Sequence, residues 1–175
     1  DGYYREMADS GMTHVEFGTE SLCDAVLTAY RKQFRVADVR AAHRAARDAG
    51  LHIAHYFLLG GPGETPDTLD QTLSNIDKLD RSVLFFFCGM RIYPHTELYD
   101  IAVKEGRISS DRNLLEPVYY RSPSVPPGEI VRTVQEKAGG RLNWIIGSGG
   151  EQAAENIARM YDKGYAGPLW EYLIR

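Results

Sequence analysis

The sequence predicts an α/β fold in which helices alternate with parallel strands. Three segments have the apolar, β-branched or aromatic composition of strands: residues 13–17, 51–59 and 83–87. Segments with helical spacing separate them, and strands that are joined through helices run parallel, with right-handed crossovers. Three strands are too few for an independent doubly wound sheet of the usual size. They suit a piece of a larger β/α barrel.

The segments between the strands have the spacing and the end signals of helices. Apolar residues recur at helical spacing over about residues 3–9, 22–29, 36–49, 66–79 and 96–105. Ser21 or Asp24 is placed to cap the second of these helices, and Gly50 follows the end of the third. Thr65 is a suitable N-cap for the fourth, with Pro66 at its first position.

The last third of the chain has a different composition. Prolines interrupt it at positions 117, 123, 126 and 127, so we expect an irregular segment after about residue 109. Helices are predicted over residues 127–146, 151–163 and 169–174, with a flexible glycine joint at 147–150. We therefore expect two parts: a barrel piece over residues 1–108 and a helical C-terminal extension over residues 109–175.

The composition is that of an ordinary globular protein, with 43% hydrophobic and 25% charged residues. A net charge of −4 argues against a dedicated nucleic-acid surface. The local group of cations, Arg31, Lys32 and Arg35, is better explained as solvated surface than as a binding patch. No apolar run is long enough to cross a bilayer and the first residues do not resemble a signal peptide, so we expect a cytoplasmic protein.

The two cysteines do not have the spacing of a metal site. Cys23 and Cys88 lie far apart in the sequence, and neither has a cluster of histidines beside it. A zinc or iron–sulfur site built from this chain alone is therefore not expected, and each cysteine is interpreted as a small buried apolar side chain. The sequence assigns no metal ligand and no catalytic residue.

A glycine-rich loop follows the second predicted strand. It contains Gly60, Gly61 and Gly63, and a helix begins immediately after it. Glycines allow a ligand to approach the backbone closely, and the N-terminus of the helix adds free N–H groups and a partial positive charge. A tight strand-to-helix turn that binds nothing explains the same residues equally well.

Charged residues occupy corresponding positions after the other two strands. Glu20 is either an acceptor for ribose hydroxyls or an ammonium group, or a charge at a helix N-terminus. Arg91 is either a partner for a carboxylate or phosphate, or half of a structural ion pair. Because the strands of a β/α barrel end at one edge, we expect Glu20, Glu64 and Arg91 to converge around a shared hollow.

Together these segments resemble the radical S-adenosylmethionine (SAM) proteins, a group that includes methylthiotransferases, coproporphyrinogen-type oxidases and cobalamin-binding members. The similar segments are Phe17-Gly18-Thr19-Glu20-Ser21 with Leu27 and Tyr30-Arg31-Lys32 after it, Ala49-Gly50-Leu51, Gly60-Gly61-Pro62-Gly63-Glu64-Thr65, Ile92-Tyr93-Pro94-His95-Thr96-Glu97-Leu98-Tyr99 and Lys104-Glu105-Gly106. The resemblance covers about residues 1–108. Two features depart from it: His95 replaces the usual glycine, and the family's C-x-x-x-C-x-x-C motif is absent.

The resemblance implies the fold, the activity and the cofactors. The fold is the C-terminal half of a partial (β/α)6 TIM-like barrel that begins after the third strand, followed by the helical extension. The complete enzyme, an Fe–S oxidoreductase or transferase, would reductively cleave SAM at a 4Fe–4S cluster to form a 5′-deoxyadenosyl radical, and cobalamin could be a further cofactor. This part lacks the cluster ligands and would be inactive alone.

The resemblance also implies which residues bind the cofactor. They are Glu20, Ser21, Leu59, Gly60, Gly61, Gly63, Glu64, Arg91 and Tyr93. Glu20 would lie near the methionine or ribose moiety of SAM, whereas Leu59, Gly61 and Glu64 would flank the adenine. Arg91 and Tyr93 would line the cofactor or substrate cavity beyond the sixth strand of the barrel.

Two other kinds of function stay open from the residues: a non-catalytic module that binds a nucleotide-like ligand, and an interaction protein whose tail contacts a partner. In the enzyme interpretation, the partners are the missing N-terminal part of the same protein and an unidentified substrate. A cut barrel leaves a strand edge uncovered, so residues 13–17 are expected to pair with another strand, for example in a second copy of the chain.

Overall fold

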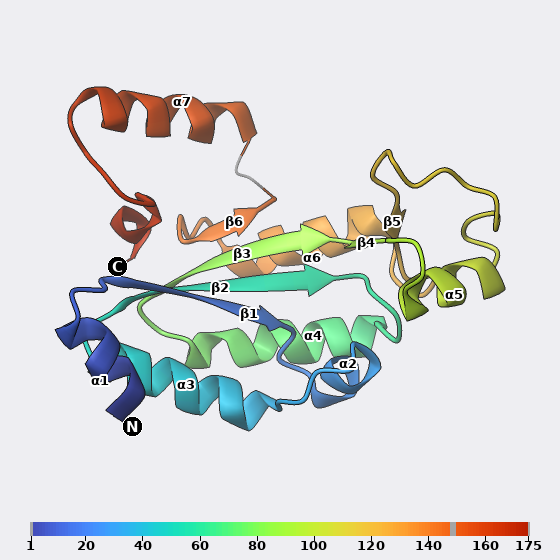
Figure 1. Ribbon diagram of the computed structural model, residues 1–175, viewed down its shortest axis with the longest axis horizontal. Helices are drawn as coiled ribbons and strands as arrows, with labels where there is room; N and C mark the ends of the chain where they lie inside the picture. Colours follow the sequence, from blue (N-terminus) through green and yellow to red (C-terminus); the bar gives the residue numbers. More distant parts are fainter. Residues whose placement is uncertain (1, 148–149, 175) are drawn as a thin grey trace.

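The computed structural model describes residues 2–147 and 150–174, and its centre is a four-stranded parallel sheet (Figure 1). The strands of this sheet are β1 (His14–Glu20), β2 (His52–Leu59), β3 (Ser82–Cys88) and β6 (Trp144–Ile146). A separate antiparallel pair consists of β4 (Met90–Arg91) and β5 (Tyr119–Tyr120). The helices are α1 (Gly2–Asp9), α2 (Asp24–Ala29), α3 (Val36–Asp48), α4 (Pro66–Asn75), the 3-10 turn η1 (Ile76–Lys78), α5 (Glu97–Lys104), α6 (Pro127–Ala138), α7 (Gly150–Asp162) and the 3-10 turn η2 (Trp170–Leu173).

The three predicted strands are parallel neighbours, which confirms the predicted fold class. β1 pairs with β2 from His14 opposite His52, and β2 pairs with β3 from Ile53 opposite Ser82. The strands run in one direction because helices return the chain across one face of the sheet before each new strand. The C-terminal ends of β1, β2 and β3 therefore lie at the same edge, on the right in Figure 1.

The end of β1 differs from the prediction. Residues 18–21 have the composition of a turn, but the strand continues through Glu20. Its pairing with β2 shifts between Phe17 and Glu20, and the backbone of Glu20 is left-handed, with a φ of 63°. The buried Thr19 hydroxyl lies 2.6 Å from Nδ1 of His55 in β2, and this hydrogen bond ties the irregular end of β1 to its neighbour.

The C-terminal part of the chain is not wholly helical. The helix expected to extend to residue 146 ends at Gly139, whose φ of 55° is left-handed. Residues 144–146 instead add β6 to the free edge of β3, because this short run is apolar and β-branched and leads into the sheet. The glycine joint expected at 147–150 falls partly outside the described residues.

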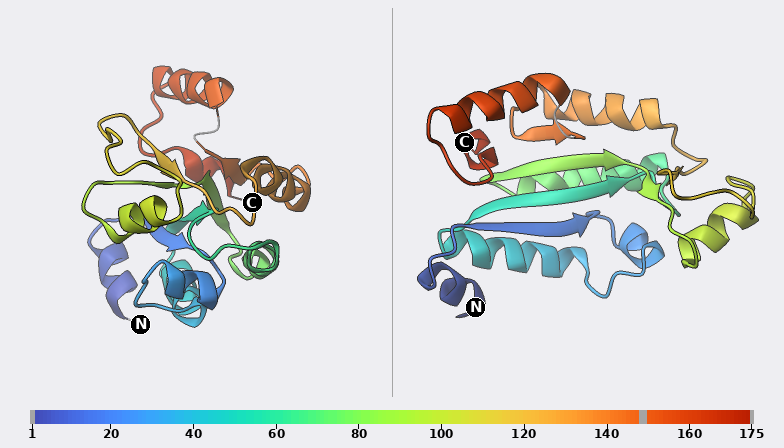
Figure 2. Two further views of the ribbon diagram at one scale, coloured as in Figure 1. Left: turned by 90° about the vertical axis from the view of Figure 1, so that its right-hand side faces the viewer. Right: turned by 45° about the horizontal axis from the view of Figure 1, so that its top comes forward.

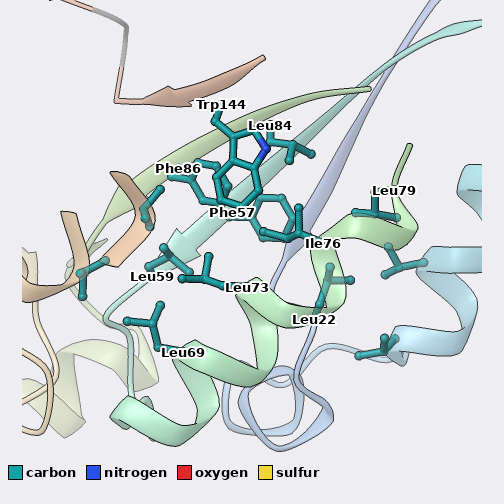
Figure 3. Packing of buried hydrophobic residues seen from close by; sticks show 14 of the residues in the cluster. Leu22, Phe57, Leu59, Leu69, Leu73, Ile76, Leu79, Leu84, Phe86 and Trp144 are labelled. Carbon is teal, nitrogen blue, oxygen red and sulfur yellow. The ribbon is translucent and has the colours of Figure 1, made fainter. Parts of the chain in front are cut away.

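The main hydrophobic core lies between the sheet and helices α3, α4 and α6 (Figure 3). Phe57 of β2 stacks on Phe86 of β3 with ring centroids 5.1 Å apart, and the ring of Trp144 in β6 lies 5.1 Å from Phe86. Leu69 and Leu73 project from α4 toward these rings. Burial of each large apolar side chain contributes about 1.5–3 kcal/mol, so this layer holds the strands in their register.

A buried chain of hydrogen bonds crosses this helix-covered side of the sheet. It runs from Thr19 to His55, from His55 Nε2 to His43 Nδ1 over 3.0 Å, and from His43 Nε2 to an Asp80 carboxylate oxygen over 3.4 Å. Arg47 also binds Asp80, over 2.9 Å. Every atom is satisfied when both imidazoles are neutral, Thr19 donates to His55, His55 donates to His43 and His43 donates to Asp80. The histidines are thus structural groups held in their uncharged form.

The opposite face of the sheet is partly covered by the end of the chain. The Trp170 side chain in η2 packs on β2 and β3, and its indole N–H donates to Glu16 Oε1 over 2.9 Å. The η2 segment lies near the N-terminal ends of the strands, as the right-hand view of Figure 2 shows. Further along, the half-buried rings of Tyr56 and Phe85 stack at 4.8 Å. The η2 turn therefore packs on this face of the sheet and is joined to β1 by a hydrogen bond.

Within residues 2–147 and 150–174, no helix has the length and apolar character needed to cross a membrane. Cys23 is buried, as predicted, and its thiol donates to Gln71 Oε1 over 3.0 Å. Cys88, at the end of β3, is half-buried.

Candidate functional site

The glycine-rich loop after β2 is held tightly at the C-terminal edge of the sheet. Gly60 and Gly63 have φ values of 80° and 78°, in the left-handed region that favours glycine. The Gly89 N–H, just after β3, donates to the Leu59 carbonyl over 2.6 Å. Thr65 then caps α4, because its hydroxyl accepts a hydrogen bond from the Thr68 N–H. The loop therefore has a fixed shape between strand and helix.

Gly61 makes the closest approach in this loop. A Cβ at this position would lie 2.4 Å from the Tyr30 hydroxyl and 2.6 Å from the Met90 sulfur. The Gly61 N–H donates to the Tyr30 hydroxyl oxygen over 3.0 Å, and the Tyr30 O–H donates to the Leu58 carbonyl over 3.0 Å. Tyr30 thus joins the end of α2 to both sides of the glycine loop.

Glu64 braces the loop from within. Its side chain is 1% exposed, and its Oε2 accepts a hydrogen bond from the Gly60 N–H over 2.6 Å, with the Tyr30 hydroxyl 3.4 Å away. The Ser122 hydroxyl donates to the Glu64 carbonyl over 2.7 Å. Burial raises the pKa of the Glu64 carboxyl to about 6, against the opposing effect of the Gly60 N–H. The second carboxylate oxygen, Oε1, is buried and has no hydrogen-bond partner among the described residues.

Replacing Glu64 with leucine is expected to lower the free energy of unfolding by about 1–3 kcal/mol, because the buried Gly60 N–H loses its acceptor. Urea denaturation measures this change. The matched control is Glu116→Leu, at an exposed glutamate in the loop before β5, which is expected to change stability little. Equal stability of the Glu64 variant and the wild type would show that the brace contributes nothing.

Glu20 lies on the Tyr30 side of the site. Its Oε1 accepts a hydrogen bond from Lys32 Nζ over 2.7 Å. Burial, followed by the charge of Glu64 and then by smaller effects that include Glu20, raises the pKa of Tyr30 above its ordinary value. Tyr30 is therefore a neutral phenol beside the Glu64 carboxylate, and Glu20 is close enough to act on it electrostatically.

Ser21 and Leu59 do not present their side chains to this site. The Ser21 hydroxyl is fully buried, lies 2.8 Å from the Thr72 hydroxyl and accepts a hydrogen bond from the Cys23 N–H. The Leu59 side chain points into the main core, so only its carbonyl reaches the loop. Both residues support the site without being available to a ligand through their side chains.

Arg91 does not share the hollow expected for Glu20, Glu64 and Arg91. The chain leaves the sheet at Gly89, whose φ is 90° and where a Cβ would lie 2.9 Å from the Tyr120 carbonyl. This turn lets β4 pair with β5 and carries Arg91 to a separate hollow beside α5. The Arg91 guanidinium lies 4.8 Å from the centre of the exposed Tyr93 ring. The expectation of a single shared hollow is therefore wrong for Arg91.

His95 stands where the resemblance places a glycine, in the turn between β4 and α5. Its φ is 62°, in the left-handed region that favours glycine. Tyr30 was not predicted as a site residue. The signal in the sequence that could have indicated Tyr30 as a site residue is its position immediately before Arg31 and Lys32.

Comparison with known proteins gives a family match over the N-terminal part. Residues 1–76 match the model of the radical SAM superfamily. Two curated relatives are similar over shorter lengths. The tRNA uridine(34) acetyltransferase of Dehalococcoides mccartyi is 33% identical over 92 residues, which are 51% of this chain and 19% of that protein. The anaerobic magnesium-protoporphyrin IX monomethyl ester cyclase of Cereibacter sphaeroides is 31% identical over 70 residues, which are 40% of this chain and 11% of that protein.

Solved structures show a similar fold over almost the whole chain. The radical SAM methyltransferase TsrM from Kitasatospora setae, with cobalamin and a 4Fe–4S cluster bound, covers 99% of this chain with a TM-score of 0.77 and 18% identity. The chain covers 40% of that structure. A second TsrM structure, with tryptophan substrate and a SAM analogue bound, matches with the same TM-score.

Together, the parallel sheet and the solved structures of similar fold define the fold class: part of a barrel-like α/β protein. The match to the radical SAM superfamily covers the first 76 residues, which are less than half of the chain. The chain spans at most about a fifth of the length of the curated relatives that it matches.

Proposed function

We propose that this chain is part of an enzyme that binds SAM at the C-terminal edge of β1 and β2. The observation that carries the proposal is the glycine loop pressed onto Tyr30 and braced by the buried Glu64, within residues that match the radical SAM family. In such an enzyme, a reduced 4Fe–4S cluster supplies the electron that cleaves SAM to methionine and a 5′-deoxyadenosyl radical, which takes a hydrogen atom from the substrate.

The residues at this edge fit a SAM molecule. Gly60 and Gly61 let the loop pack directly on Ile130, Tyr30 and Met90, and we place the adenosyl group against the backbone of the loop that these contacts fix. The buried Oε1 of Glu64 lacks a partner among the described residues, and an N–H or O–H group of a bound molecule would supply one. Glu20 carries a carboxylate for ribose hydroxyls or an ammonium group, and Lys32 holds it in place.

The same part of the chain does not fit the cluster. Among the described residues, no three His, Cys, Asp or Glu side chains gather as metal ligands. We therefore propose that the cluster ligands belong to another part of the full-length protein. The same part would pair with the edge of β1, which no described strand covers.

Cobalamin is included in the proposed cofactors of the full-length protein because the TsrM structure of similar fold contains it. No described residue of this chain is assigned to it. The relatives include a methyltransferase, an acetyltransferase and a cyclase. We accordingly propose an Fe–S oxidoreductase or transferase without choosing between these reactions.

Anaerobic SAM cleavage by the full-length protein tests this proposal. The protein is reconstituted with iron and sulfide, reduced with a one-electron donor and incubated with SAM. We expect 5′-deoxyadenosine and methionine in equal amounts, measured by mass spectrometry. The proposal fails if a protein with an intact, reducible cluster neither binds nor cleaves SAM. That outcome would favour the non-catalytic binding module or the interaction protein.

A further inference from the structure

A hollow lies apart from the glycine loop, between β4, α5 and the segment that follows α5. It has a volume of about 630 Å³ and is lined by Arg91, Pro94, His95, Tyr99 and residues 110–115. Sites for small molecules usually have volumes of about 300–1,000 Å³. It also lies beyond the C-terminal end of β3, where enzymes of this barrel type position groups that contact their substrates.

The chain segment after α5 that forms one wall of this hollow is held by hydrogen bonds at both of its ends. On one side, the Tyr99 O–H in α5 donates to the Ser110 carbonyl over 2.8 Å. On the other side, Arg91 pairs with Tyr119 in the β4–β5 ladder, and the Ile92 N–H donates to the Val118 carbonyl over 2.8 Å. The segment between these anchors, yellow in Figure 1, is therefore held beside α5 at both of its ends.

The charges around this hollow are unbalanced. Arg91 and Arg112 both line it, and neither guanidinium forms an ion pair with any residue in 2–147 or 150–174. Asp111 is the one carboxylate among the described lining residues, and it already accepts a hydrogen bond from the Ser109 hydroxyl. Two unpaired guanidiniums beside an imidazole favour a negatively charged ligand.

The hollow also has an apolar side. Leu114 and Leu115 line it next to Pro94, and the Leu115 side chain is 86% exposed. An exposed leucine beside two arginines is suited to a ligand that carries both an anionic group and an apolar group.

We propose that this hollow binds the carboxylate or phosphate group of a small molecule, with the apolar part of that molecule against Leu114 and Leu115. Arg91 and Arg112 hold the anionic oxygens from opposite walls. That this molecule is the substrate of the enzyme rests on the proposed function, but the binding itself does not, because it needs neither SAM nor a cluster.

Binding of four simple probes to the full-length protein tests the inference. Inorganic phosphate, acetate, phenyl phosphate and benzoate are titrated at constant ionic strength by calorimetry, without SAM or reductant. We expect one of the two aromatic probes to bind with a Kd of about 1 mM or tighter. Arg91→Ala and Arg112→Ala are each expected to weaken that binding about 10-fold or more. A tighter phenyl phosphate identifies a phosphate site, and a tighter benzoate identifies a carboxylate site.

Two control variants distinguish specific binding in this hollow from nonspecific attraction of anions to a positively charged surface. Arg107→Ala removes a nearby arginine whose Nε already lies 3.8 Å from Glu105, and it is expected to leave the Kd unchanged. Leu115→Ser is expected to weaken only the aromatic probes. The inference is overturned if no probe binds, or if Arg107→Ala weakens binding as much as Arg112→Ala. A protein that binds the probes but does not cleave SAM contradicts the proposed function alone.

Discussion

Replacing Gly61 with alanine is expected to destabilise the protein by about 1–3 kcal/mol and to weaken SAM binding about 10-fold or more. The added Cβ would lie 2.4 Å from the Tyr30 hydroxyl and 2.6 Å from the Met90 sulfur, far inside van der Waals contact. The loop must then move away from Tyr30, which breaks the hydrogen bond from the Gly61 N–H. Urea denaturation measures the first effect, and SAM titration of the full-length protein measures the second.

Gly128→Ala is the matched control for this substitution. Gly128 lies in α6, and nothing lies within 4 Å of a Cβ built there. Alanine in a helix is expected to be neutral or slightly stabilising at this position. If Gly61→Ala were as stable as the wild type, the close approach to Tyr30 would not constrain the loop. If it lost stability but retained SAM binding, the loop would not be the SAM site.

Acidification is expected to destabilise the fold by about 1.4 kcal/mol for each pH unit between 6.5 and 3, through His55. Burial, and then the neighbouring His43, lowers the pKa of His55 from 6.5 to about 3. Burial lowers the pKa of His43 as well. Between pH 6.5 and 3, His55 is protonated in the unfolded chain but not in the folded chain. The contribution of neutral His55 to the free energy of unfolding is therefore complete above pH 6.5 and is lost as the pH falls toward 3.

His55→Gln tests this dependence, because glutamine can keep hydrogen bonds to Thr19 and His43 but does not titrate. We expect a lower stability at pH 7 and a shallower loss between pH 6.5 and 4, measured by urea denaturation at several pH values. His52→Gln, at an exposed histidine in the same strand, is the control and is expected to keep the wild-type slope. Identical slopes for the two variants would show that the buried chain of hydrogen bonds does not govern acid stability.

The parallel strands could be predicted because each is a strongly apolar run bounded by turn residues. Residues 51–59 and 83–87 lie within or close to β2 and β3 as observed. β6 could not be predicted, because three residues give too short a pattern to distinguish a strand from a helix. Only the free edge of β3, a property of the folded sheet, turns residues 144–146 into a strand.

The candidate site was predicted only in part. The glycine loop and Glu64 carry their signal in the sequence, because closely spaced glycines before a helix cap require a sharp turn. The direction of Arg91 has no such signal. It depends on the pairing of β4 with β5, about thirty residues later, which only the folded chain reveals. Tyr30 likewise acts through a contact with Gly61 that lies 31 positions away.

The hydrogen bond between Trp170 and Glu16 joins residues that are 154 positions apart. During synthesis, the start of β1 leaves the ribosome long before this indole exists. The sheet face beneath Trp170 therefore stays open to water, or to chaperones, until the last residues of this segment emerge. This face can be covered only after Trp170 has been made, and a chain shortened before residue 170 would retain an uncovered apolar face.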